Sequence, residues 1–112
     1  MHEQTSDFQV LTESTNGYIG MCVCCREFNF GFKTILVSFH EDEMVQFFEW
    51  LMAGRTKQND TVLPHGRNRL YSSPYGNLFL AFNDAELDEI GILYTEVQLM
   101  LETRKILFTR GR

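Results

Sequence analysis

The sequence predicts a single α+β domain with an antiparallel sheet and two helices. Short apolar segments, 8–13 and 18–25, lie on either side of Asn16-Gly17, a pair that favours a tight hairpin turn because both residues tolerate positive φ. Two longer segments repeat apolar residues at helical spacing, and each follows an apolar strand pattern. The 112 residues, 44% of them hydrophobic, suffice for one core and are too few for two independent domains.

The first half of the chain is expected to hold most of the sheet. A strand is predicted over residues 18–25, followed by a turn and the long apolar stretch 28–39, "FNFGFKTILVSF". Within this stretch the apolar residues change parity between Phe32 and Ile35. The change of face predicts a bulge near Gly31, or burial on both faces.

Two helices and a long loop complete the prediction. The first helix begins near Glu41, where an acidic first turn suits the positive end of the helix dipole, and ends at Gly54. The stretch 55–69 is polar and rich in turn residues, which is typical of a loop. A strand is expected over residues 77–82, and the second, longer helix follows it to about Arg104.

An internal repeat relates the two halves. The segment "ILVSFHEDEMVQF" aligns with "LFLAFNDAELDEI" at an offset of 43 residues. Each copy holds an apolar strand, a capped acidic turn and an amphipathic helix, and Asn83 and Glu86 have the spacing of a capping box. The predicted strand-strand-helix units cover about 18–54 and 70–104 within one domain, 1–112. Any strand followed by a capped helix would give similar spacing, so a true duplication stays open.

Both predicted helices carry apolar residues outside their main stripes. These residues are Val45, Trp50 and Met52 in the first helix and Ile92 and Leu99 in the second. A domain of this size cannot bury every helix face, so we expect some of them to contact a protein partner. The simplest partner is a second copy in a homodimer, since twofold association is the commonest form. The alternative is that these residues pack under loops.

All three cysteines lie within four positions, at Cys22, Cys24 and Cys25. Cys22 and Cys25 form a C-x-x-C pair, whose spacing allows two thiolates to share a zinc ion, but a structural zinc site needs four ligands. Either Cys24 and a distant histidine complete the site, or two protomers each contribute the pair. His65 is the leading histidine, because the repeat aligns it with Cys22. Zinc is therefore a possible cofactor, although the leading expectation is no cofactor, with the cysteines acting as small apolar strand residues.

Catalysis is the least favoured class of function. A reactive C-x-x-C stands at a helix N-terminus, whereas these cysteines precede Arg26, Glu27 and a strand pattern, so a thiol-redox protein ranks third. The sequence has no glycine-rich phosphate loop, no G-x-S-x-G and no H-E-x-x-H motif. We predict no catalytic residue.

Composition limits the kinds of partner and the cellular compartment that we expect for this protein. A net charge of -5 without a basic face argues against nucleic-acid binding. No apolar run approaches the ~18 residues of a membrane span, and the N-terminus lacks the pattern of a signal peptide. We therefore expect a cytoplasmic protein with reduced thiols. The leading hypothesis is a small homodimeric binding or regulatory module, and the alternative is a zinc-stabilised interaction module.

The segments "GYIGMCVCC" and "FGFKTILVSF" resemble the N-terminal signature of an uncharacterised family of short proteins from Bacteroidetes-group bacteria. The resemblance covers about residues 15–103, with Cys22 and Cys25 as the matching pair and Cys24 as an extra cysteine. It implies a C-x-x-C strand, two strand-helix halves and a bacterial origin. It implies no activity.

Overall fold

The computed structural model describes residues 8–55 and 63–110, with side chains described as far as residue 104. The elements in chain order are β1 (Phe8–Glu13), β2 (Gly17–Cys22), β3 (Phe28–Phe32), β4 (Ile35–Phe39), α1 (Glu41–Gly54), the short 3-10 helix η2 (Pro64–Gly66), β5 (Arg69–Ser72), β6 (Phe79–Phe82) and α2 (Asp84–Arg110). Strands β1 to β4 form an antiparallel sheet in sequence order, and β5 and β6 form a separate hairpin. The predicted α+β class, with an antiparallel sheet and two helices, is confirmed.

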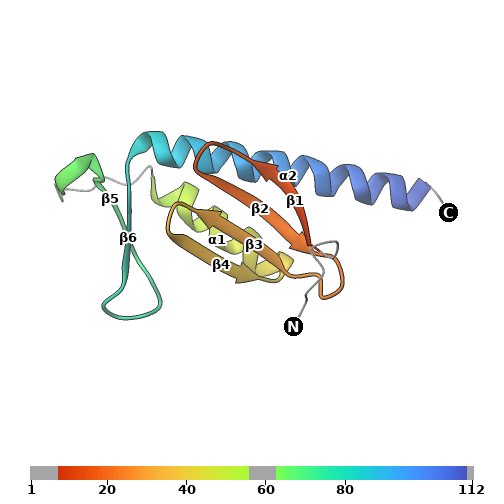
Figure 1. Ribbon diagram of the computed structural model, residues 1–112, viewed down its shortest axis with the longest axis horizontal. Coiled ribbons are helices and arrows are strands. Elements are labelled where there is room, and N and C mark those ends of the chain that lie inside the picture. Colours follow the sequence, from red (N-terminus) through yellow and green to blue (C-terminus); the bar gives the residue numbers. More distant parts are fainter. Residues whose placement is uncertain (1–7, 56–62, 111–112) are drawn as a thin grey trace.

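The helices lie on one side of the four-stranded sheet (Figure 1). Helix α2 runs along the length of the molecule behind β1 and β2, and α1 lies behind β3 and β4. The β5–β6 hairpin projects from one end of the molecule, away from the sheet. The sheet therefore has one covered face, toward the helices, and one outer face.

The apolar stretch that follows the cysteines forms two strands. Phe32 of β3 pairs with Ile35 of β4 across a two-residue turn, in which Lys33 adopts a φ of 54°. A two-residue turn places the flanking residues opposite each other on the same face of the sheet, which accounts for the change of parity. The expected bulge near Gly31 and the expected burial on both faces are both wrong, because the stretch contains a reversal of the chain.

The core lies between the covered face of the sheet and the two helices. Its fully buried large side chains are Ile19, Phe30 and Phe32 from the sheet, Met44, Phe48 and Leu51 from α1, and Leu87, Ile90, Leu93 and Val97 from α2. The Phe48 ring lies 4.9 Å from that of Phe30 and stacks at 4.7 Å on that of Tyr94, centroid to centroid. The sheet, α1 and α2 thus share one apolar cluster.

Each helix begins with a capping interaction. The Glu43 carboxylate accepts a hydrogen bond from the His40 backbone N–H at 2.9 Å. At the start of α2, the Asn83 side chain accepts from the Glu86 N–H at 2.7 Å, and the Glu86 carboxylate accepts from the Asn83 N–H at 2.9 Å. The second pair is the predicted capping box, and it fixes where α2 begins.

Two glutamates of α2 bind the hairpin turns of the sheet. Glu86 is 5% exposed and accepts hydrogen bonds from Lys33 Nζ at 2.6 Å and from Arg67 at 2.8 Å. Glu89 accepts from the backbone and side-chain amides of Asn16, each at 2.8 Å. Burial opposes ionisation of both carboxyl groups, but the hydrogen bonds outweigh this effect and lower the pKa of each.

Candidate metal centre

The cysteines lie in a tight turn, residues 22–26, which we name the cysteine turn. Strand β2 ends at Cys22, so the strand predicted to continue to Cys25 is three residues too long. The Arg26 N–H donates to the Cys22 carbonyl at 2.8 Å, and the Cys22 N–H donates to the Glu27 carbonyl at 2.8 Å. Arg26 adopts a φ of 62°, which returns the chain toward β3. An extended strand would separate residues 22 and 25 by about 10 Å, whereas the turn brings them together.

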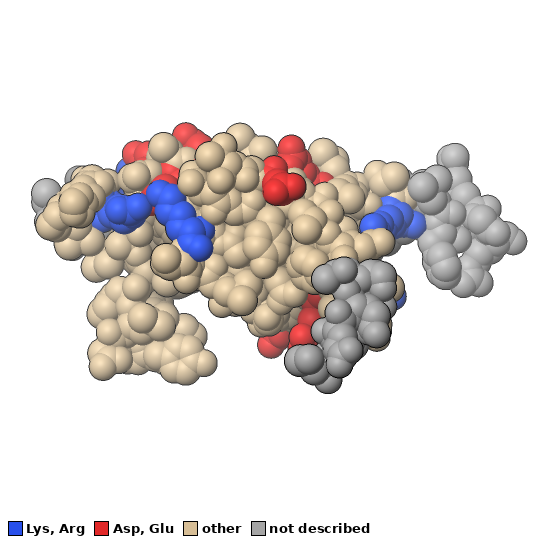
Figure 2. Space-filling model, viewed as in Figure 1, with Lys and Arg blue, Asp and Glu red and all other residues tan. Residues whose placement is uncertain are grey.

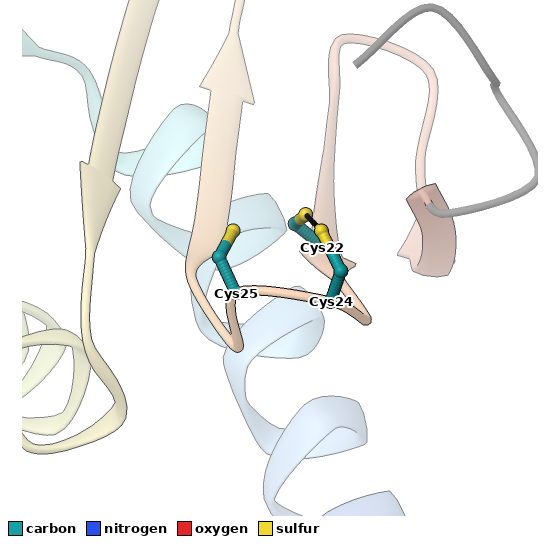
Figure 3. A group of neighbouring side chains, drawn as sticks. All are labelled: Cys22, Cys24 and Cys25. Carbon is teal, nitrogen blue, oxygen red and sulfur yellow. Dashed lines mark hydrogen bonds between the residues drawn. The ribbon is translucent and has the colours of Figure 1, made fainter. Parts of the chain in front are cut away.

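The turn brings all three thiols together. The Sγ atoms of Cys22, Cys24 and Cys25 lie within 4.8 Å of one another. The Cys22 and Cys24 sulfurs are 3.3 Å apart and face each other, with Cys25 on the β3 side of the turn (Figure 3). Zinc–sulfur bonds of about 2.3 Å in a tetrahedral site place sulfurs roughly 3.8 Å apart. Small side-chain adjustments would therefore give the sulfur separations that one zinc ion requires.

The hydrogen bonds of the turn shift the pKa values of Cys22 and Cys25 in opposite directions. They lower the pKa of Cys22, chiefly through the Cys25 side chain, then through the Cys25 backbone and the Cys24 side chain. The same side-chain hydrogen bond raises the pKa of Cys25. These hydrogen bonds favour the thiolate form of Cys22, which is buried, while Cys24 and Cys25 are exposed. A thiolate is the form that binds a metal ion.

The structure does not bring His65 to the cysteines. His65 is exposed and lies on η2, which is at the opposite end of the molecule from the turn between β2 and β3 (Figure 1). Among the described residues, no histidine or carboxylate joins the three thiols. Cys24, which is extra to the family's C-x-x-C pair and which one predicted ligand set included, does join them. The described part of the chain therefore supplies three thiol ligands to this site.

The predicted interface residues all lie on the helices. Trp50, Ile92 and Leu99 are 38%, 60% and 63% exposed, while Val45 and Met52 are half-buried. Met52 and Ile92 line a shallow groove of about 480 Å³ between α1 and α2. None of the helices that the structure describes is long and apolar enough to cross a membrane.

Sequence reasoning missed exposed apolar residues on the strands. Val10 and Leu36 lie on the sheet, and Tyr75, Leu78 and Phe79 lie at or near the end of the β5–β6 hairpin. The faces of β3 and β4 could be assigned only once the turn between them was known, so the exposure of Leu36 could not be predicted from the sequence.

Comparison with known proteins supplies a family. The model of one protein family matches residues 4–107. No curated protein and no solved structure matches the chain. The resemblance to an uncharacterised family is confirmed at this level, and its restriction to Bacteroidetes-group bacteria stays a prediction. Because the match spans nearly the whole sequence, the chain belongs to a family of unknown function (DUF6686).

Proposed function

We propose that this protein is a zinc-binding interaction module whose metal site is the cysteine turn. The observation that carries the proposal is the convergence of three sulfurs within 4.8 Å at a turn closed by two backbone hydrogen bonds. Thiolates are the ligands that zinc and other soft ions prefer. This convergence favours the zinc-stabilised module over the metal-free module that ranked first on sequence alone.

Binding would change the protonation of the turn. Each thiol that ligates the ion loses its proton to solvent, so three ligating cysteines release up to three protons per zinc ion. Ionisation of Cys22 is favoured, because hydrogen bonds from Cys25 and Cys24 lower its pKa. Zinc affinity would therefore rise with pH as the ligating thiols lose their protons. The bound ion would fix the shape of the turn without catalysing a reaction, in a cytoplasmic protein with reduced thiols.

Zinc content of protein purified without an affinity tag tests the proposal. We expect one zinc ion per chain by elemental analysis, and loss of that stoichiometry in Cys22→Ser, Cys24→Ser and Cys25→Ser. Leu78→Ala is the control, because Leu78 is an apolar residue, 52% exposed, that lies outside the cysteine turn. A wild-type protein that takes up no zinc under reducing conditions would refute the metal site.

A second candidate is a thiol-redox role, favoured by the lowered pKa of Cys22 and by the 3.3 Å contact between the Cys22 and Cys24 sulfurs. Glutathione disulfide would oxidise two protein thiols to one disulfide and would leave as two molecules of glutathione. Thiol counting after such treatment separates the two roles. A zinc-loaded protein that keeps three thiols supports the metal site, and rapid loss of two thiols supports the redox role.

A further inference from the structure

The outer face of the four-stranded sheet carries one charged side chain, that of Glu13, on the strand residues whose register is described. The register places on this face Phe8, Val10, Glu13, Tyr18, Gly20, Cys22, Asn29, Gly31, Leu36 and Ser38. Figure 2 shows the molecule from this side, and its charged side chains lie around the margin of a central uncharged area. The one charged residue among these ten lies at the end of β1, so the middle of the face is uncharged in a chain with 22% charged residues.

Two aromatic rings make this face apolar and close-packed. The Phe8 ring covers Gly20 and the Tyr18 ring covers Gly31, where a Cβ atom would lie 2.5 Å and 2.4 Å from those rings. The rings meet edge to face, with centroids 6.2 Å apart. Val10 on β1 and Leu36 on β4 stand exposed beside them, at 52% and 67%. The face therefore offers aromatic and aliphatic surface to a partner.

The cysteine turn continues this face. Cys22 pairs with Phe8 in the register of β1 and β2, so both side chains lie on the outer side of the sheet. Val23, the next residue, is 44% exposed. A partner seated on the outer face would therefore also meet the thiols.

The number of ligands indicates which partner this is. A structural zinc site has four ligands, and the described residues of one chain offer three. Two copies offer six thiolates. Two zinc ions that share two of these thiolates are each four-coordinate, with three ligands from one chain and one from the other. The exposed Cys24 and Cys25 are the thiols placed to be shared.

We infer that a second copy of this chain packs against the outer sheet face and completes the metal centre, so that a homodimer holds two zinc ions by six thiolates. The inference rests on the proposed zinc site and names the partner of that site. It places the dimer contact on the sheet near Val10, Val23 and Leu36, whereas the sequence pattern placed it on the helices.

Light scattering of the full chain, with zinc and after treatment with a chelator, tests the inference together with zinc analysis. We expect the mass of a dimer with one zinc ion per chain, and the mass of a monomer once the metal is removed. X-ray absorption at the zinc edge should give four sulfur neighbours and a second zinc ion nearby. A monomer that binds one zinc ion would overturn the inference and leave the zinc site standing, whereas absence of zinc binding would overturn both.

Two matched variants locate the contact. Leu36→Glu introduces like charges on the outer face and should weaken dimerisation on the order of a hundredfold, with three sulfurs and one lighter ligand around zinc in the resulting monomer. Leu99→Glu, at a similarly exposed site on α2, should leave the dimer intact. The opposite result, in which Leu99→Glu dissociates the dimer and Leu36→Glu does not, overturns the inference in favour of the helices. Far-UV circular dichroism verifies that both variants fold.

Discussion

Two hairpins with similar local sequence patterns differ in sheet pairing and in burial. The β3–β4 hairpin and the β5–β6 hairpin are each followed by a capped helix. The predicted first unit, about 18–54, holds three strands, β2 to β4, where two were expected. The first hairpin pairs with β2 and buries Phe28, Phe30 and Phe32. The second forms its own sheet, is packed through Tyr71 and Phe82, and exposes Tyr75 and Phe79.

The difference comes from what precedes each hairpin. Strand β3 follows β2 through the cysteine turn, so an antiparallel neighbour is already in place. Strand β5 follows η2 and pairs with no strand of the main sheet among the described residues. A local pattern can therefore specify a hairpin and a helix, while burial of the hairpin depends on its neighbours.

The largest contrast should come from removing one aromatic ring from each hairpin. Phe30→Ala, at a fully buried site in β3, should lower the free energy of unfolding by about 3–5 kcal/mol, because it removes apolar contacts and leaves a cavity. Phe79→Ala, at a site in β6 that is 50% exposed, should cost less than about 0.5 kcal/mol. Urea denaturation measures both. Equal losses would show that the second hairpin is as well packed as the first.

A smaller loss of unfolding free energy is expected from a change at the contact between the two units. Glu86→Gln weakens the charged hydrogen bonds to Lys33 of the first unit and Arg67, and should cost about 2 kcal/mol. Asp88→Asn is the control. The Asp88 carboxylate is exposed and forms an ion pair with Arg55, so its loss should cost about 0–1 kcal/mol of stability. If the two variants lose the same stability, Glu86 does not couple the units.

Acid should weaken the same junction. The pKa values of Glu86 and Glu89 are lowered in the folded protein, so the unfolded chain takes up protons first as the pH falls. Their contribution to stability is present above the ordinary carboxyl value of 4.5 and is lost as the pH falls through the lowered folded values. Unfolding free energies measured across this range should fall less steeply in Glu86→Gln. An identical pH dependence in the variant would contradict this origin.

The smallest effect should appear at the base of the second hairpin. The Tyr71 hydroxyl donates a buried hydrogen bond of 2.6 Å to the Leu51 carbonyl of α1. Tyr71→Phe should cost about 1 kcal/mol and speed hydrogen exchange of β5 and β6 more than that of β3. Tyr75→Phe, at a site that is 72% exposed, should change neither quantity. Uniform acceleration across the whole chain would mean that the two hairpins open together.

Several features of the fold could be predicted because their causes are local. The start of α1 at Glu41 and its end at Gly54 agree with the structure, since acidic first turns and helix stops act on neighbouring residues. The reversal at Lys33 was missed, because Lys33 and Thr34 carry no Gly or Asn signal for a tight turn. The early end of β2 was missed for the same reason, at Arg26.

The sequence by itself determined the element types, the capping of the helices and the clustering of the cysteines. Only the tertiary structure decided which hairpin joins the sheet, which face of the sheet lies outside, and that Cys24 meets Cys22 and Cys25. It also joined Lys33 to Glu86, which is 53 residues further along the chain. Propensity and capping act over a few residues, whereas sheet register, burial and sulfur positions depend on contacts and turns that bring the chain back on itself.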